Sequence, residues 1–279
     1  MKTTQPQGSQ VDPTSAELEK VRRVAATDGN AFHAKVARHF KQQHWRALIS
    51  PYYVDNATGQ AREVDLLCER VFPIRFHDEN RWGVYRIQLF VECKYLQGPV
   101  VFWFDEQDRQ RTLWWLDQHT PFKRSNKTSQ NKHRYIGTGT HVAKLFRTDR
   151  GDHDHGQDPF YKGLAQSLGA LIQRRGAPPL EDLPDKYGEP LKVMTVQYPV
   201  IVCSDTTTPG FYRTDIEDHP SGVLPMLHTF QLEVDYAYTG RRGIEEEYFL
   251  VDVVRFGKLD VFLESLQREA DEATLVLGN

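Results

Sequence analysis

Two carboxylates and a lysine stand in neighbouring stretches of the chain whose apolar and polar residues alternate. Asp65 lies in residues 62–67, and Glu92 and Lys94 close residues 85–95. Alternate residues of a β-strand point to the same face, so Glu92 and Lys94 project together from their strand. The opposite face of that strand is apolar and carries Ile87, Leu89, Val91 and Cys93. If the two strands are neighbours in a sheet, the two carboxylates and the lysine converge.

Convergence of Asp65 and Glu92 would bring together two carboxylates, which repel and raise each other's pKa unless a cation lies between them. Oxygen ligands favour a hard cation such as Mg²⁺, with Mn²⁺ as the substitute, and Mg²⁺ also reaches phosphate oxygens. A lysine beside the cation can orient or deprotonate a water molecule and offset charge on a phosphorane-like transition state. Together with Lys94, the pair therefore predicts metal-assisted hydrolysis of a phosphodiester bond.

The alternative is a solvated strand face with a cross-strand ion pair and no chemistry. Two observations favour the site instead. Glu92 and Lys94 close an otherwise strongly apolar strand, which is followed by another apolar run at residues 100–104. Residues 62–67 also follow a hairpin turn of the Asx/Gly type at residues 55–59.

The elements around these residues alternate between helical and strand patterns. Helices are predicted over residues 15–25, 31–43 and 258–270, with a further helix that begins at Asp158-Pro159 and includes Ile172. Strands are predicted over residues 47–54, 62–70, 85–95, 100–104, 191–203, 230–238 and 248–255. In the second strand, Glu63 and Asp65 share one face. Asp158-Pro159 provides an N-cap followed by a proline at the first helical position. The order predicts an α/β fold, a mixed central sheet flanked by helices.

This fold is expected as a single domain over residues 15–279, preceded by a disordered tail at residues 1–14. The tail is rich in Gln, Ser, Thr and Pro. Residues 105–157 fit no simple pattern of helix or strand and are expected to form a sizeable insertion after the active-site strands.

Asp65 followed by Glu92-Cys93-Lys94 on consecutive strands resembles the PD-(D/E)xK nuclease superfamily, which has the restriction-endonuclease-like fold. In that family a helix precedes a three-stranded meander that carries Asp and then Glu-x-Lys, and an α-β unit follows. Residues 32–94 match that order, and residues 160–203 look like the following helix and strand. The resemblance implies that Asp65, Glu92 and the backbone carbonyl of Cys93 are metal ligands and that Lys94 is the catalytic lysine.

Many relatives carry a glutamate in the leading helix, where this chain has Phe32-His33, and His33 is a candidate substitute. Some relatives also point a glutamine from the later helix toward the site, and Gln166 is the matching residue. The missing glutamate favours an alternative, a catalytically inactive or partner-activated nucleic-acid-binding subunit of a larger complex. The presence of Asp65, Glu92 and Lys94 together favours the enzyme.

DNA is the expected substrate, ahead of RNA, and a basic stretch in the insertion could contact it. Residues 123–134 contain no acidic residue and carry the candidate phosphate contacts Lys123, Arg124, Lys127, Lys132 and Arg134. The alternative is a solvated mobile loop. Trp103, Trp114 and Trp115 could stack on bases, but core packing is the favoured interpretation.

Composition excludes other classes of protein. The net charge of −3 argues against coating of nucleic acid through bulk charge. No apolar run approaches the roughly 20 residues that cross a bilayer, no signal peptide is recognisable, and the three scattered cysteines indicate a reducing compartment. The expected location is the cytoplasm, with no membrane partner.

Short motifs add little to this interpretation. Residues 152–155, Asp-His-Asp-His, are favoured as a polar loop over a metal site, and Gly137-x-Gly139 is too weak for a dinucleotide site. No Walker A motif occurs, so a partner chain would supply any ATPase or sensor function. A homodimer would let each protomer cut one strand, and restriction or anti-phage (antiviral) defence is the expected role.

Overall fold

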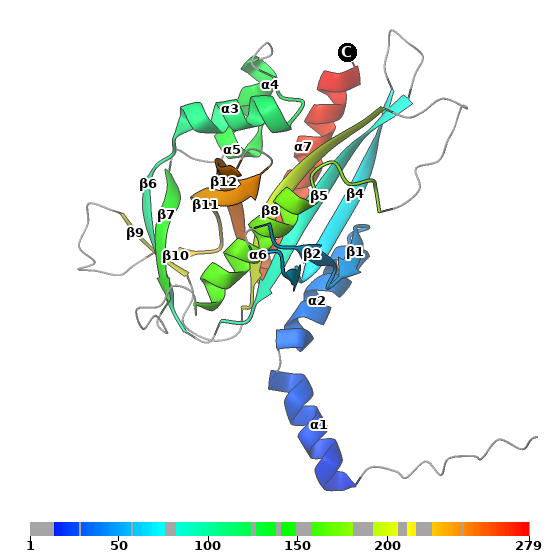
Figure 1. The fold of residues 1–279 in the computed structure, drawn as a ribbon, viewed down its shortest axis with the longest axis vertical. Helices are drawn as coiled ribbons and strands as arrows, with labels where there is room; N and C mark the ends of the chain where they lie inside the picture. Colours follow the sequence, from blue (N-terminus) through cyan, green and yellow to red (C-terminus); the bar gives the residue numbers. More distant parts are fainter. Residues whose placement is uncertain are drawn as a thin grey trace, which may run out of the picture.

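The structure, a computed structural model, describes residues 14–27, 29–56, 58–75, 82–96, 98–123, 127–137, 141–148, 158–180, 192–205, 211–215, 225–240 and 243–278 (Figure 1). The helices are α1 (Ser15–Thr27), α2 (Gly29–Gln42), α3 (Arg109–His119), α4 (Lys127–Lys132), α5 (Arg134–Gly137), α6 (Pro159–Gln173) and α7 (Leu259–Gly278), with a 3-10 turn at Phe256–Lys258. No helix in these ranges is long and apolar enough to cross a membrane.

The described strands form one large mixed sheet and one small hairpin. The strands of the large sheet, in spatial order, are β1 (Arg46–Ile49), β4 (Leu66–Arg75), β5 (Trp82–Lys94), β8 (Lys192–Cys203), β12 (Gly243–Arg255), β11 (Thr229–Gly240), β7 (His141–Thr148), β6 (Val100–Glu106), β9 (Phe211–Asp215) and β10 (Met226–Leu227). The hairpin consists of β2 (Tyr52–Val54) and β3 (Ala61–Glu63). Because β5–β8 and β8–β12 are parallel and β4–β5 and β11–β12 are antiparallel, the sheet is mixed. The predicted α/β class, a mixed sheet flanked by helices, is confirmed.

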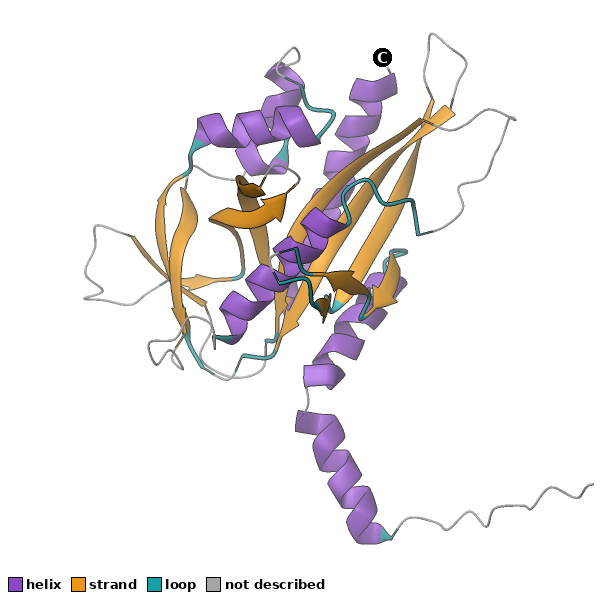
Figure 2. Ribbon diagram, in the orientation of Figure 1, coloured by secondary structure: helices purple, strands orange, loops and turns teal. Residues whose placement is uncertain are grey.

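Helices cover both faces of the sheet (Figure 2). On one face α2 and α7 pack on the apolar side of β5, which carries Ile87, Leu89 and Val91. On the other face α6 packs with Phe90 and with residues of the outer strands, among them Phe102. β5 is therefore buried on both sides, and side chains on either face of it are held by tight packing.

Two of the predicted strands are wrong as continuous elements. The strand predicted over residues 47–54 breaks at Ser50-Pro51, where Ser50 has φ +50° and Pro51 has no N–H to donate. The strand predicted over residues 62–70 breaks at Val64-Asp65. The outer halves pair as the β2–β3 hairpin, closed by the predicted turn through a hydrogen bond from the N–H of Gly59 to the carbonyl of Asp55 (2.7 Å). Glu63 and Asp65 therefore do not share a strand.

Other boundaries follow the sequence more closely. α6 begins at the predicted cap, with the Asp158 side chain accepting from the N–H groups of Phe160 and Tyr161. α7 is longer than predicted, β9 and β10 were not expected, and residues 105–157 include α3, α4, α5 and β7. Of the predicted tail only Thr14 lies within the described residues, and it exchanges hydrogen bonds with Glu17 at the start of α1.

A buried ionic cluster joins α7 to the strands and to α5. Glu269 accepts hydrogen bonds from the hydroxyls of Tyr85 (3.1 Å) and Tyr198, and from Nε of Arg134 (2.9 Å). Nε2 of His133 lies 3.3 Å from the same carboxylate. Burial alone would raise the pKa of Glu269, but His133, Arg134 and the hydrogen bond from Tyr198 outweigh it and lower the pKa to about 2.

This lowered pKa makes the fold sensitive to acid. The folded pKa lies below the ordinary 4.5 of an unfolded glutamate, so the Glu269 carboxylate stabilises the fold above pH 4.5 and loses that effect as the pH falls toward 2. Between pH 6 and pH 3 we expect the free energy of unfolding to fall by about 2 kcal/mol more in wild type than in Glu269→Gln. Urea titrations between pH 6 and pH 3 measure this difference. Parallel pH profiles for the two proteins would contradict the assignment.

Candidate active site

Asp65 lies at the corner where the small hairpin meets the large sheet. Its backbone carbonyl accepts hydrogen bonds from the N–H of Ser50 (2.8 Å) and from Nε2 of His33 on α2 (2.6 Å). The N–H of Val64 donates to the carbonyl of Pro51 (3.2 Å). The break in both predicted strands therefore fixes the backbone of Asp65 from two sides, and α2 reaches the site through His33.

The two carboxylates meet where the end of β5 extends beyond the start of β4. Leu66 pairs with Val91 at the start of β4, so the last residues of β5 have no β4 residue opposite them. The Asp65 side chain takes that place, because its Oδ2 accepts from the N–H of Cys93 (2.7 Å), while Oε1 of Glu92 accepts from the N–H of Asp65 (3.2 Å). The N–H and C=O of one strand residue point toward the same neighbour, so the carbonyl of Cys93 lies on the Asp65 side.

Lys94 closes the group from the α6 side of the sheet. Its Nζ donates to Oε2 of Glu92 at 2.8 Å, and the exposed fractions of the two side chains are 15% and 1%. The lysine runs under α6 at Gly163, where a Cβ atom would lie 2.2 Å from Cε of Lys94. The site thus depends on a glycine in a helix interior, a position where glycine otherwise weakens a helix.

Burial sets the electrostatics of the site. It raises the pKa of Glu92 to about 7, with Asp65 adding to the rise and Lys94 opposing it. Burial disfavours the ammonium of Lys94, but Glu92 and Asp65 outweigh it and keep the Lys94 pKa above its ordinary value. The Lys94 ammonium therefore favours the charged form of Glu92 against its burial.

α6 attaches the site to the hairpin and to β5. Nε2 of Gln166 donates to the backbone carbonyl of Glu63 (3.1 Å), two residues before Asp65. The hydroxyl of Ser167, which is fully buried, donates to the carbonyl of Phe90 (2.7 Å), two residues before Glu92. Gln166 therefore lies beside the site, bonded to the backbone of β3 two residues before Asp65.

The donors suit a hard cation, though they are few. Among the described residues no group of three or more His, Cys, Asp or Glu side chains could hold a metal ion. The site offers two carboxylates, Asp65 and Glu92, and the carbonyl of Cys93 as the third oxygen donor. These are the donor types that Mg²⁺ prefers, since it retains several waters and needs few protein ligands. The raised pKa of Glu92 fits a site that gains from a cation.

The predicted phosphate contacts in residues 123–134 whose side chains the structure describes do not form one basic surface. Arg134 is buried, with 7% of its surface exposed, and is ion-paired to Asp252 (2.5 Å) and Glu269, so its prediction as a nucleic-acid contact is corrected to a core residue. Lys132 pairs with Glu272 on α7 (3.0 Å). Lys123 is exposed and donates to the carbonyl of Asp117. Arg124 lies outside the described residues, as does the side chain of Lys127.

The remaining motifs do not add to the site. Trp115 is 3% exposed and packs in the core, as favoured, whereas Trp114 is 49% exposed. The Asp-His-Asp-His stretch at residues 152–155 lies outside the described residues. Gly163 and Ser50 were missed from the sequence. A glycine within the amphipathic pattern of residues 159–173 is the one signal that could have pointed to Gly163, because glycine in a helix interior calls for a packing reason.

Comparisons with protein-family models, with curated proteins and with solved structures found no match for this chain.

Proposed function

We propose that this chain is a metal-dependent nuclease of the PD-(D/E)xK type that hydrolyses phosphodiester bonds of DNA. The observation that carries the proposal is the convergence of Asp65, Glu92 and Lys94 at the end of β5, with Asp65 bonded to the backbone of Cys93 and Lys94 to Glu92. The order of α2, β4 with Asp65 directly before it, β5 with Glu92 and Lys94, α6 and β8 supports a restriction-endonuclease-like core with residues 105–157 as an insertion.

In this proposal Asp65, Glu92 and the carbonyl of Cys93 would hold Mg²⁺, or Mn²⁺ in its place. The cation, when bound, supplies Lewis acidity and lowers the pKa of the attacking water. Lys94 orients the attacking water and offsets negative charge that develops on the phosphate. Gln166 and His33 act on the backbone, because each is hydrogen-bonded to a carbonyl of the segment that carries Asp65. They are positioning residues that keep the two carboxylates in register.

A second candidate is a catalytically inactive or partner-activated nucleic-acid-binding subunit. The observation that favours it is His33, which stands where many relatives have a glutamate and contacts the Asp65 backbone instead of adding a third carboxylate. The enzyme is preferred because Lys94, Glu92 and Asp65 form one bonded group despite the cost of burying them. Cytoplasmic restriction or anti-phage defence, a homodimer that cuts both strands and a partner ATPase or sensor chain remain parts of the same proposal.

Cleavage of supercoiled plasmid in Mg²⁺ tests the proposal. Wild type should nick or linearise the plasmid, and EDTA should abolish the activity. Lys94→Ala should lower the rate by about 10² to 10³, because the groups that stabilise transition-state charge contribute on that scale. Lys41→Ala, which removes an exposed lysine of α2, is the matched control and should keep the wild-type rate. Equal rates for Lys94→Ala and wild type would refute the assignment, and no cleavage of DNA or RNA by wild type would favour the binding subunit.

A further inference from the structure

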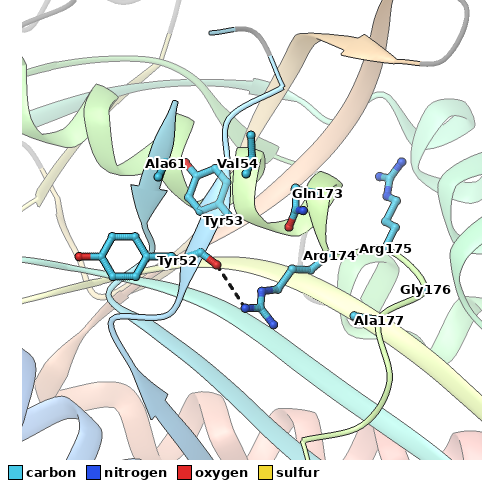
Figure 3. Close-up of a pocket in the computed structure, with 9 residues that line it drawn as sticks. All are labelled: Tyr52, Tyr53, Val54, Ala61, Gln173, Arg174, Arg175, Gly176 and Ala177. Carbon is cyan, nitrogen blue, oxygen red and sulfur yellow. Dashed lines mark hydrogen bonds between the residues drawn. The ribbon is translucent and has the colours of Figure 1, made fainter. Parts of the chain in front are cut away.

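A hollow of about 480 Å³ lies between the β2–β3 hairpin and the C-terminal end of α6 (Figure 3). It is lined by Tyr52, Tyr53, Val54, Ala61, Gln173, Arg174, Arg175, Gly176 and Ala177. The proposed catalytic group contributes none of these residues. The hollow combines an aromatic ring, backbone groups and arginine side chains, a mixture typical of surfaces that contact nucleic acids.

Arg174 and Tyr52 are the side chains that could recognise a ligand there. Arg174 donates to the backbone carbonyl of Tyr52 (3.2 Å), which orients the guanidinium and uses one of its five N–H donors. Tyr52 is 64% exposed, and its ring projects from the hairpin on the side away from Arg174 (Figure 3). Arg175 points away, and its guanidinium is held by both carboxylate oxygens of Glu247 (2.6 and 2.7 Å). Arg174 is therefore the cation that the hollow presents.

The segment that carries Arg174 is held by polar side chains of the large sheet that take no part in the proposed catalytic group. Arg86, 4% exposed, donates to the carbonyl of Ala177 (2.9 Å), and Glu69, 3% exposed, accepts from the N–H of Leu180 (2.9 Å). Gln197 donates to the carbonyl of Arg174 (3.3 Å). Burying such groups costs free energy unless they are hydrogen-bonded, and the bonds that they make hold residues 174–180 in one conformation.

The hollow is also rigidly connected to the proposed catalytic group. Tyr52 pairs with Glu63, two residues before Asp65. Gly163 touches Lys94, and Arg174 follows eleven residues later at the end of the same helix. At 1.5 Å per residue this places the hollow about 16 Å along α6 from the lysine. With about 3.4 Å of helix axis per nucleotide of one strand, the distance corresponds to roughly five nucleotides.

We infer that this hollow binds the backbone of the nucleic-acid substrate roughly five nucleotides from the bond that is cut. Arg174 contacts a phosphate, because a guanidinium matches phosphate oxygens in charge and geometry. The exposed Tyr52 ring, which projects away from Arg174, packs against a nucleotide farther along the same strand. The inference rests on the proposed nuclease function and adds to it the surface that positions the substrate strand. Pre-organisation by Arg86, Glu69 and Gln197 means that little freedom is lost when the strand binds.

Fluorescence anisotropy with a labelled 24-base-pair duplex tests the inference, in a Lys94→Ala background so that the duplex is not consumed. Arg174→Ala should weaken binding about tenfold. It should also reduce the magnitude of the slope of log affinity against log salt concentration by about one, which corresponds to the loss of one phosphate contact. Tyr52→Ala should weaken binding about fivefold, and Tyr52→Phe should restore it. Arg22→Ala removes the same charge from the exposed surface of α1 and should change affinity less than twofold. Unchanged affinity in Arg174→Ala, with an unchanged melting temperature, would overturn the inference.

Cleavage by the otherwise wild-type chain separates this inference from the function on which it rests. Bis(p-nitrophenyl) phosphate reaches only the catalytic group, so Arg174→Ala should hydrolyse it at the wild-type rate while its KM for duplex DNA rises about tenfold. If wild type cleaves DNA and Arg174→Ala matches it in KM, the hollow is excluded and the nuclease stands. If no DNA is cleaved but binding still requires Arg174, the nuclease fails and the hollow stands. If wild type does not bind the duplex, both fail.

Discussion

Gly163→Ala is expected to abolish most of the proposed nuclease activity while leaving the fold intact. A Cβ at this position would lie 2.2 Å from Cε and 3.1 Å from Nζ of Lys94, distances that the lysine side chain cannot tolerate. The lysine is flexible and its end would move, taking Nζ from its 2.8 Å hydrogen bond to Glu92. We expect the cleavage rate to fall about 10²-fold, as for loss of a positioned catalytic group. Alanine is also the better helix former, so the melting temperature should not fall.

Gly169→Ala is the matched control, because it makes the same substitution six residues later in α6. A Cβ there would meet the Tyr53 ring at 3.2 Å, a contact that a shift of a few tenths of an ångström relieves, and it meets no atom of Lys94. Its rate should stay within a few-fold of wild type. If both alanine variants cleave plasmid DNA at the wild-type rate, the position of Lys94 under α6 does not matter for cleavage. If Gly163→Ala lowers the melting temperature sharply, the glycine is needed for the fold.

The proposed catalytic group could be predicted from the sequence to the extent that it depends on strand periodicity. Glu92 and Lys94 lie two residues apart on a strand whose other face is apolar, and a period of two fixes their common direction in any sheet. The position of Asp65 could not be predicted in the same way, because it depends on the break at Ser50, whose φ of +50° only tertiary contacts select. Periodicity predicts Asp65 within a strand. The structure places it at a corner instead, where its side chain accepts a hydrogen bond from the N–H of Cys93 on β5.

The basic stretch at residues 123–134 shows where local sequence patterns fail to predict burial. Five Lys or Arg residues without an acidic neighbour in the sequence favour a solvated surface, because a cation near no local anion is costly to bury. The partners that neutralise Arg134 are Asp252 and Glu269, more than a hundred residues away along the chain. No local pattern indicates them. The same composition therefore contains Lys132, which is half exposed, and Arg134, which belongs to the core.

Arg134→Met is accordingly expected to destabilise the protein by about 3–5 kcal/mol, the cost of leaving buried charges without their partner. Removing the guanidinium leaves the carboxylates of Asp252 and Glu269 buried, and it also removes the contacts of Arg134 with the rings of Tyr135 and Tyr198 (4.3 Å each). Urea unfolding at neutral pH, followed by circular dichroism, measures the change. Lys132→Met is the control, because its pair with Glu272 is largely solvated and contributes at most about 1 kcal/mol.

A double-mutant cycle distinguishes a buried ion pair from simple loss of packing. If Arg134 acts by neutralising Glu269, Glu269→Gln should cost much less in the Arg134→Met background than in wild type, because the carboxylate it removes has already lost its ion pair with Arg134. Additive costs would mean that Arg134 contributes mainly through its aliphatic stem and the tyrosine rings. Equal unfolding free energies for Arg134→Met and Lys132→Met would instead place Arg134 on the surface in solution and return it to the set of candidate phosphate contacts.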